Sequence, residues 1–403
     1  METVYEAVKI NEYIFWVGAI DWNIRDFHGY STNRGSTYNA FLILTDKITL
    51  MDTVKEPFRN EMISRISSII DPGEISYVIS NHSEMDHSGC LWEIIDIVKP
   101  EKVFASVMGV KALTAHFHNL KDIIAVKEGD SISLGNMDVN FIETRMLHWP
   151  DSMFSYLPAE KLLFSNDAFG MHLASNERYA DEIDDYIIEN EGEKYFSNIL
   201  LLYSSLVLKL LDKVKSIGLE LDMILPDHGP IWRTKEDIAK ILNYYAAWAE
   251  QKPVKKAVIL YDTMWGSTEK MAHVISEGLA NDDIEIHLFP MKTTHRSDVV
   301  KEILKCGALI VGSSTLNNNI LPTIADVMTY LKGLRPKNLI GASFGSYGWS
   351  GESIGQLDNI LKEMGVEIIG ESIKAQYVPN ADDLARCFNL GKTIAEKLNT
   401  ITL

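Results

Sequence analysis

The chain has 403 residues, 46% hydrophobic and 23% charged, which is the composition of an ordinary globular protein with room for two domains. Its 38 Lys and Arg against 56 Asp and Glu give a net charge of −18, which repels phosphate backbones and anionic membrane surfaces. We therefore expect neither a nucleic-acid partner nor a membrane partner, although the charge also serves solubility.

Three cysteines occur, Cys90, Cys306 and Cys387, and no two of them form a Cys-x-x-Cys pair. This argues against iron–sulfur, rubredoxin-type and structural zinc sites built from thiolates, and it favours a reducing, cytoplasmic compartment. The N-terminus has neither the basic nor the apolar region of a signal peptide. The most apolar stretch, 199–211, is interrupted by polar residues and predicts a buried helix rather than a membrane span.

The first part of the chain alternates short apolar runs with helical patterns. Strands are predicted at 37–44, 48–52, 77–80, 102–105 and 139–143, and helices at 58–70 and 107–118, as expected for a mixed sheet with helices outside. The patterns at 195–216 and 235–250 are helical. The polar, Pro-containing segment 251–256 is the expected domain linker.

After this linker the rhythm is β-α-β. Strands are predicted at 257–261, 284–289, 308–311, 339–344 and 366–373, and helices at 268–281, 297–306, 322–331, 353–364 and 381–398. Five strands alternating with helices predict a parallel, doubly wound sheet of flavodoxin size.

Side chains that can bind metal crowd the loop after the run 77–80. His82, Glu84, Asp86 and His87 fall within six residues. In an extended segment alternate side chains share a face, so His82, Glu84 and Asp86 can converge while His87 turns back at the next helix. The cluster predicts a metal site, and a polar loop that caps the next helix is the simpler alternative.

Three further residues stand where later apolar runs end. They are His148 in Leu-His-Trp-Pro, Asp167 in Phe-Ser-Asn-Asp and His228 in Pro-Asp-His-Gly. Taken singly, each is better explained as an ordinary loop residue. Together with the cluster they form a convergent set, which predicts a binuclear metal site.

This spacing resembles the metallo-β-lactamase-like superfamily, whose usual cluster, His-x-His-x-Asp-His, holds zinc. Here Glu84 stands at the second His position. Four His with one Glu and two Asp make a harder, more oxygen-rich site, which suits iron better than zinc. A redox-active pair of metals is therefore favoured over a hydrolytic one.

An anion-binding loop follows the run 257–261. Hydroxyls and backbone N–H groups at a helix N-terminus bind anions without Lys or Arg. The loop resembles the flavodoxin phosphate loop, Thr/Ser-x-Thr-Gly-x-Thr, although Trp265 replaces its inner hydroxyl; a capped βα turn is the alternative. Its residues are Thr263, Met264, Trp265, Gly266, Ser267 and Thr268.

Two more loops fall at the C-terminal ends of the next central strands, where a flavodoxin binds its flavin. Small residues allow close approach to a flat ring, amides can bond to its polar edge, and aromatics can stack on it. We predict FMN here, against the alternative that the aromatics pack on the sheet rim. The loops contain Thr315, Leu316, Asn317, Asn318 and Asn319, and Ser346, Tyr347, Gly348, Trp349, Ser350 and Gly351.

With both constellations, the chain resembles the flavodiiron proteins, also called A-type flavoproteins, over essentially its whole length. Matching segments are 19–23, 147–153, 165–170 and 345–352, and they are most similar to the rubredoxin-dependent branch. The resemblance implies an N-terminal metallo-β-lactamase-like αββα domain over 1–250 and a linker over 251–256. It implies a C-terminal flavodoxin-like doubly wound parallel sheet over 257–403.

The resemblance also implies roles for the candidate residues. One iron is held by His82, Glu84 and His148 and the other by Asp86, His87 and His228, with Asp167 as the bridge and Tyr195 as a catalytic residue near the pocket. Some relatives do not use the first His. FMN takes electrons from rubredoxin, and the irons reduce dioxygen to water or nitric oxide to nitrous oxide. A head-to-tail homodimer, or a dimer of dimers, brings the flavin of one subunit to the irons of the other.

Three alternatives stay open at this point. Within the family, the donor can be a reduced deazaflavin coenzyme instead of rubredoxin. Outside it, the chain can be a zinc-dependent glyoxalase-type hydrolase with a regulatory flavin domain. It can also be a non-catalytic electron-transfer flavoprotein on a degenerate metal fold. The sequence does not choose between dioxygen and nitric oxide.

Overall fold

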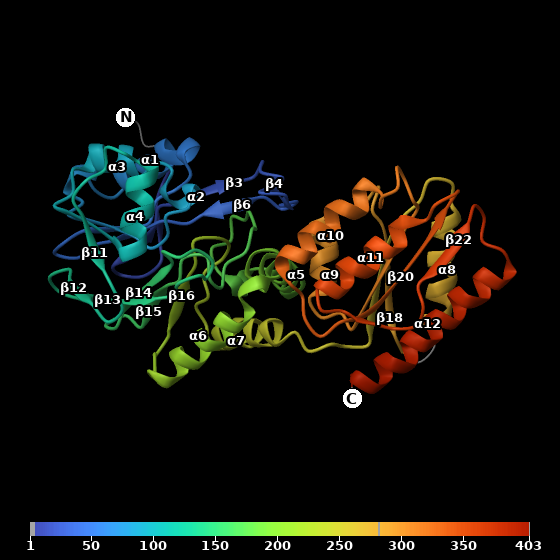
Figure 1. Ribbon diagram of the computed structural model, residues 1–403. Coiled ribbons are helices and arrows are strands. Elements are labelled where there is room, and N and C mark those ends of the chain that lie inside the picture. Colours follow the sequence, from blue (N-terminus) through green and yellow to red (C-terminus); the bar gives the residue numbers. More distant parts are fainter. Residues whose placement is uncertain (1–4, 281–282, 403) are drawn as a thin grey trace. The chain divides into compact units, whose positions relative to one another are not determined.

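The computed structural model describes residues 5–280 and 283–402, which form two compact units (Figure 1). The first unit contains residues up to 28, 32–195 and 205–246, and the second contains 29–31, 196–204 and 247 onward. The predicted helix end at residue 281 lies outside the described residues.

The first unit is built on two sheets rather than on the single mixed sheet expected from the alternating runs. The larger sheet has seven strands, antiparallel at one edge and parallel at the other, in the order β1 (Val8–Lys9), β2 (Ile14–Trp16), β7 (Phe41–Ile43), β8 (Thr49–Met51), β9 (Tyr77–Ser80), β10 (Lys102–Ser106) and β11 (Ile123–Val126). The smaller has five, in the order β12 (Ser131–Ser133), β13 (Asp138–Glu143), β14 (Met153–Leu157), β15 (Leu162–Phe164) and β16 (Met223–Leu225).

Strand alternation explains why the sheets stack with helices outside. Phe41 and Ile43 face a core shared with the second sheet, where Phe41 meets Phe164 at 5.4 Å between ring centroids. Leu42 points the other way, into a core that contains Met62 and Ile94. These last two lie on α1 (Arg59–Ser67) and α3 (Leu91–Val98), and α4 (Val107–His116) covers the same face.

Aromatic contacts cover the outer face of the second sheet. Phe154 of β14 contacts Phe169, whose ring lies 4.7 Å from that of Tyr245 on α7 (Lys235–Glu250). The layers are therefore helix, sheet, sheet, helix, and the predicted αββα class is confirmed.

The predicted strand 37–44 is two strands. β6 (Ser36–Tyr38) pairs with β3 (Ala19–Asp21), and β7 pairs with β2 and β8. Asn39 separates them because its backbone N–H donates to the carbonyl of Asp227 instead of to a neighbouring strand. The short strands β4 (Asp26–Phe27) and β5 (Tyr30–Ser31) follow β3 in sequence.

The predicted helix 195–216 is longer and irregular. It comprises α5 (Asp185–Tyr195), a π-helical segment at Phe196–Leu200, a short 3₁₀ turn and α6 (Ser204–Ser216). Within the part of the chain that the structure describes, only this stretch is long and apolar enough to cross a membrane by composition, and half of it is buried inside the protein. Leu210 is buried while Leu202 is 39% exposed, so the predicted buried helix has one exposed side.

The second unit contains the predicted parallel sheet. Its strand order is 2-1-3-4-5, the flavodoxin order, with β17 buried along its whole length. The strands in that order are β18 (Glu285–Pro290), β17 (Lys256–Asp262), β19 (Ala308–Ser313), β20 (Ile340–Tyr347), and a fifth strand split into β21 (Glu367–Ile368) and β22 (Ile373–Gln376).

Helices cover both faces of this sheet, as Figure 1 shows. α8 (Ser267–Leu279) and α12 (Ala381–Ile401) pack against each other on one face; α9 (Arg296–Ile303), α10 (Pro322–Leu334) and α11 (Glu352–Glu363) complete the unit. The doubly wound prediction is confirmed. The segment predicted as a polar linker is fixed at its start, because Gln251 is buried and bonds to Ser204, Lys337 and Asn338.

Candidate metal centre and flavin pocket

The seven predicted metal ligands gather where four strands of the first unit end. They come from the loop after β9 and the short helix α2 (Met85–Ser88), from the β13–β14 loop, and from the segments after β15 and β16. Parallel and antiparallel strand ends meet at one edge of the sandwich, which is why residues far apart in sequence converge there.

One group of four side chains surrounds a common point. His82 Nε2 lies 3.3 Å from Glu84 Oε2 and 3.3 Å from Asp167 Oδ2. His148 Nε2 lies 3.2 Å from Glu84 Oε2 and 2.9 Å from Asp167 Oδ2. One nitrogen or oxygen from each of these four residues fits within 4.8 Å of all the others, which is the spacing of atoms that bind one metal ion.

A second group lies beside the first. Asp86 Oδ2 is 3.3 Å from His87 Nε2 and 3.1 Å from His228 Nε2. Both carboxylate oxygens of Asp86 are buried without a hydrogen-bond partner among the described residues. A buried carboxylate left in this way needs a positive charge beside it, so this group fits a second cation.

Asp167 joins the two groups. Its Oδ2 faces His82 and His148, while its Oδ1 lies 3.1 Å from His87 Nε2 and 3.4 Å from His228 Nε2. The Asp167 side chain is buried, with its two oxygens turned toward different groups. This is the geometry of a carboxylate that bridges two ions.

Asp86 does not share a face with His82 and Glu84 as the extended alternation predicts. The chain turns helical at Met85, so Asp86 and His87 lie in one helical turn and point to the second group. Glu84 is the last residue of the extended segment, with ψ of 146°. Alternation therefore holds only for His82 and Glu84.

The electrostatics of the cluster favour cations. Burial alone would lower the pKa of His87, but the charges of Asp86, Asp167 and Asp227 raise it to about 10. Burial would also lower the pKa of His148, but its hydrogen bonds to Asp167 and Glu84 raise it to about 9. Burial would raise the pKa of Glu84, yet hydrogen bonds from the histidines hold it below its usual range. Carboxylates that stay ionised and imidazoles that attract protons make a site that exchanges protons for metal.

Several polar neighbours of the ligands were missed by sequence reasoning. Asp151 Oδ2 lies 3.2 Å from His82 Nδ1, the carbonyl of Thr37 lies 2.6 Å from His228 Nδ1, and Asp227 Oδ2 lies 3.7 Å from His87 Nδ1. His28 Nε2 lies 3.3 Å from Glu84 Oε1, although the His28 side chain is 74% exposed. Only Asp151 and Asp227, each within three residues of a ligand, could have been suspected from the sequence.

Tyr195 lies next to the second group. Its buried ring is 5.2 Å from the ring of His172 and 6.2 Å from that of His228. Burial and the nearby carboxylate charges raise its pKa well above the ordinary value, so it stays a neutral phenol. Ser36 Oγ connects the same two imidazoles, at 2.8 Å from His172 Nδ1 and 3.3 Å from His228 Nδ1.

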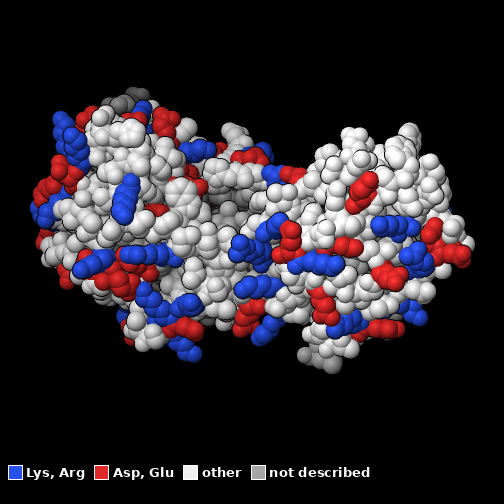
Figure 2. Space-filling model, viewed as in Figure 1, with Lys and Arg blue, Asp and Glu red and all other residues white. Residues whose placement is uncertain are grey.

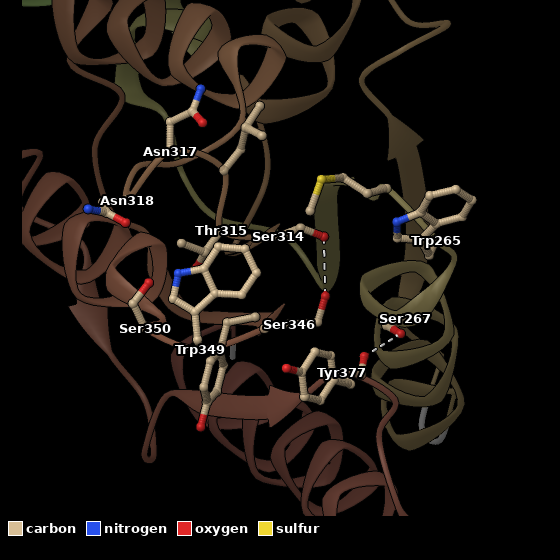
Figure 3. A pocket seen from close by; sticks show the side chains of 14 residues that line it. Trp265, Ser267, Ser314, Thr315, Asn317, Asn318, Ser346, Trp349, Ser350 and Tyr377 are labelled. Carbon is tan, nitrogen blue, oxygen red and sulfur yellow. Dashed lines mark hydrogen bonds between the residues drawn. The ribbon is translucent and has the colours of Figure 1, made fainter.

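A cavity of about 480 Å³ opens at the C-terminal ends of the central strands of the second unit (Figure 3). Most of the predicted flavin-binding residues line it, and Ser314 and Tyr377, which sequence reasoning missed, line it too. The lining is Met264, Trp265, Ser267, Ser314, Thr315, Leu316, Asn317, Asn318, Ser346, Tyr347, Gly348, Trp349, Ser350 and Tyr377.

Five predicted residues, Thr263, Gly266, Thr268, Asn319 and Gly351, are not among the lining side chains. Thr263 Oγ1 accepts from the Gly266 N–H and closes the turn, and Gly351 has φ of +84° at the start of α11. Thr268 is fully buried, with Oγ1 at 2.9 Å from both Ser314 Oγ and Ser346 Oγ. These residues shape the loops rather than the cavity wall.

The cavity suits a flat aromatic ring with a polar edge. The Trp349 side chain lies at its mouth 86% exposed, and that of Trp265 is 94% exposed, so both indoles have free faces for stacking (Figure 3). No lining residue is charged. At the phosphate loop, Lys292 Nζ donates to the carbonyl of Thr263 at 2.5 Å. On the face shown in Figure 2, acidic and basic side chains are interspersed.

Known proteins match this chain in both halves. The profile of the ODP family beta lactamase matches residues 37–229, and that of flavodoxin matches residues 259–391. The nitric oxide reductase of Moorella thermoacetica is 46% identical over 98% of this chain and 99% of its own length. The rubredoxin oxygen:oxidoreductase structure from Desulfovibrio gigas superposes with a TM-score of 0.96 at 44% identity, covering 98% and 99% of the two chains. The flavodiiron protein of Giardia intestinalis superposes at 0.94 with 29% identity over 98% of each chain.

Fold, site and comparisons together define an oxidoreductase with a β-lactamase-like domain followed by a flavodoxin domain. The chain belongs to the flavodiiron protein family. Its cofactors are FMN and two irons. The orphaned Asp86 oxygens and the oxygen-rich donor set fit the iron pair, and the uncharged cavity with exposed indoles fits the flavin.

Proposed function

We propose that this chain reduces dioxygen to water, or nitric oxide to nitrous oxide, with electrons that enter through FMN from rubredoxin. The observation that carries the proposal is Asp167, whose two oxygens face the two groups of candidate ligands separately. A carboxylate that faces both sets supports a pair of metals, and Glu84, an oxygen donor where the usual cluster has an imidazole, favours redox iron over hydrolytic zinc. The names of the similar proteins point to the same substrates.

Each candidate ligand has a proposed role. His82, Glu84 and His148 would hold one iron, Asp86, His87 and His228 would hold the other, and Asp167 would serve both. When bound, the two irons supply a place for the gas to bind and be reduced. The surrounding protein excludes bulk water, since all seven side chains are at most 15% exposed. Burial raises the pKa of Tyr195, so its hydroxyl stays protonated and would donate a hydrogen bond or a proton in this pocket.

The flavin site has two proposed parts. Residues 263–268 would cradle the phosphate with hydroxyls and backbone N–H groups at the N-terminus of α8. Residues 315–319 and 346–351 would bind the ring, with Trp349 stacked on it.

Metal analysis together with flavin quantification tests the proposal. Protein purified without added metal should contain about two irons and one FMN per chain, and it should consume dioxygen or nitric oxide when reduced. Asp167→Ala should lose iron from both groups, while Asp212→Ala, at an exposed position of α6, should keep it. Zinc with no flavin, together with thioester hydrolysis, would instead establish the glyoxalase-type hydrolase.

The identity of the donor is tested separately. Stopped-flow mixing of the FMN-loaded protein with reduced rubredoxin should reduce the flavin rapidly, and reduced deazaflavin coenzyme alone should not. Rapid reduction by the deazaflavin would replace rubredoxin as the donor without changing the assignment of the metal site.

We further propose a head-to-tail homodimer, or a dimer of dimers, in the cytoplasm. The exposed indoles of Trp265 and Trp349 at the flavin pocket support a partner surface there. Light scattering on the purified protein should give a mass at least twice that of one chain, and a monomer would contradict the proposed dimer.

We propose domain limits of 1–250 and 257–403, with the linker 251–256 between them. They are supported by profile matches that end at 229 and begin at 259.

A further inference from the structure

Asp151 makes an unusually concentrated set of contacts beside the metal centre. Its Oδ2 accepts from the backbone N–H of Ser83 at 2.6 Å and from the Ser83 hydroxyl at 2.7 Å, and it lies 3.2 Å from His82 Nδ1. Asp151 is 3% exposed, so these contacts are shielded from water. One buried oxygen therefore holds both His82 and the residue after it.

This contact fixes how the His82 ring is turned. A carboxylate oxygen at Nδ1 requires that this nitrogen carries the proton, which leaves the Nε2 lone pair for a metal. Nε2 points to the first group, at 3.3 Å from Glu84 Oε2 and 3.3 Å from Asp167 Oδ2. Trp149 closes one side of the ring, with centroids 5.3 Å apart and planes at 89°.

Asp151 is itself anchored from another part of the sheet. Its carbonyl accepts from Ser106 Oγ at 2.7 Å, and the same Ser106 oxygen accepts from the Gly109 N–H and so caps α4. The bond to Ser106 uses the backbone carbonyl of Asp151, whereas the contacts to His82 and Ser83 use its carboxylate, so the two can be removed separately.

The other imidazoles are held differently. His228 Nδ1 has the carbonyl of Thr37 at 2.6 Å, and His87 Nδ1 has only the more distant Asp227 oxygen at 3.7 Å. Of these three imidazoles, His82 is the one whose Nδ1 lies close to a carboxylate oxygen, and that oxygen also accepts two further hydrogen bonds.

We propose that Asp151 is the positioning residue that commits His82 to the first iron of this chain. The inference rests on the proposed function, because it assumes that His82, Glu84, His148 and Asp167 hold iron. It assigns the orientation of His82 toward the first iron to a contact made by a residue that touches neither metal nor substrate.

Mössbauer spectroscopy and iron release test the proposal. In iron-loaded Asp151→Ala, the signal of one iron should change while that of the other stays, and release of that iron to a chelator should be about 10- to 100-fold faster. Asp151→Asn keeps the side-chain shape and an acceptor oxygen, and it should restore part of the wild-type spectrum. Ser106→Ala is the matched control: it removes the bond to the Asp151 carbonyl but leaves the carboxylate, so the spectrum should stay unchanged.

Combination with His82→Ala separates positioning from general destabilisation. If Asp151 acts through His82, Asp151→Ala in the His82→Ala background should change the spectrum and the release rate no further. A wild-type spectrum in Asp151→Ala, or full additivity with His82→Ala, would overturn the inference. Wild-type protein that holds no iron pair would instead overturn the proposed function. If the wild-type protein holds two irons and Asp151→Ala leaves the spectrum unchanged, only this inference is overturned.

Discussion

The indole N–H of Trp16 donates a 2.9 Å hydrogen bond to the side-chain oxygen of Asn39. This bond orients the Asn39 amide so that its nitrogen donates to the carbonyls of Pro226 and Gly229, at 2.7 and 3.0 Å. The two carbonyls flank His228 in the sequence. A buried tryptophan of the sandwich core thereby determines the position of a candidate iron ligand.

Asn39→Ala should therefore damage both stability and the second metal position. Two buried carbonyls and the Trp16 N–H lose their partner, which should lower the free energy of unfolding by about 2–3 kcal/mol. Urea unfolding of the metal-free protein measures this loss, and iron analysis should show weaker loading. Asn119→Ala, at an exposed position, should change the unfolding free energy by no more than about 0.5 kcal/mol. Equal effects of the two substitutions would refute the role of Asn39.

The metal centre should make the stability of the metal-free protein depend on pH. The folded-state pKa values of His87 and His148, about 10 and about 9, lie above the ordinary value of 6.5. Protonation of these rings stabilises the metal-free fold fully below about pH 6.5, and this contribution disappears as the pH rises through 9 to 10. Urea unfolding at a series of pH values should show the decline.

The iron-loaded protein should not show that decline, because the metal occupies the nitrogens that would carry the protons. Iron affinity should instead rise from about pH 6 to pH 9, since protons compete less well for the same nitrogens as their concentration falls. A flat stability profile in the metal-free protein would contradict the raised pKa values.

Thr268→Val tests the hydroxyl contacts beneath the flavin pocket. The substitution keeps the shape of the side chain but removes the oxygen that lies 2.9 Å from both Ser314 and Ser346. Loss of one to two buried hydrogen bonds, each worth about 1 kcal/mol, should weaken FMN binding by about 5- to 30-fold. Fluorescence titration with FMN measures the change. Ser276→Ala, on the exposed side of the same helix, should leave the affinity unchanged.

Gly278→Ala should destabilise the flavodoxin unit, because α8 and α12 cross in close contact there. A Cβ at Gly278 would lie 2.1 Å from the carbonyl oxygen of Phe388 and 3.1 Å from the Cα of Gly391. Forcing the helices apart should cost about 1–3 kcal/mol in thermal or urea unfolding.

Gly355→Ala is the matched comparison for that substitution. It lies in α11 with nothing within 4 Å of the added methyl group, so it should stabilise the helix by up to about 1 kcal/mol. If both substitutions destabilise alike, the helix crossing is not the cause.

The sequence was most informative where local pattern decides structure. The β-α-β rhythm predicted the doubly wound sheet, and the ligands at the ends of apolar runs marked one edge of the sandwich. Prediction from the sequence failed where a contact between residues distant in the sequence determines the local structure. The run 37–44 is broken at Asn39 by a bond to Asp227, and the regular helix expected at 195–216 contains a π-helical segment.

The residues that support the two sites were missed for the same reason, because their contacts join segments distant in the sequence. Ser314 and Tyr377 line the flavin pocket through the folding of separate loops, and no motif marks them. Asp151 could be suspected because it lies three positions after His148, but its contact with His82 could not be predicted, since an aspartate in a loop usually caps a turn or faces water. Its partner His82 is 69 residues away in the sequence.

The β13–β14 loop carries His148 and Asp151 only three positions apart, with one side chain facing the metal centre directly and the other supporting His82. The length of this loop is therefore fixed. Inserting or deleting one residue between them would displace two imidazoles of the same group at once. The turns at Gly129 and Gly218, where an added methyl group would meet nothing within 4 Å, impose no such restriction. A protein engineer who wishes to attach a tag, or to graft a new loop onto this domain, should use those turns and leave the β13–β14 connection untouched.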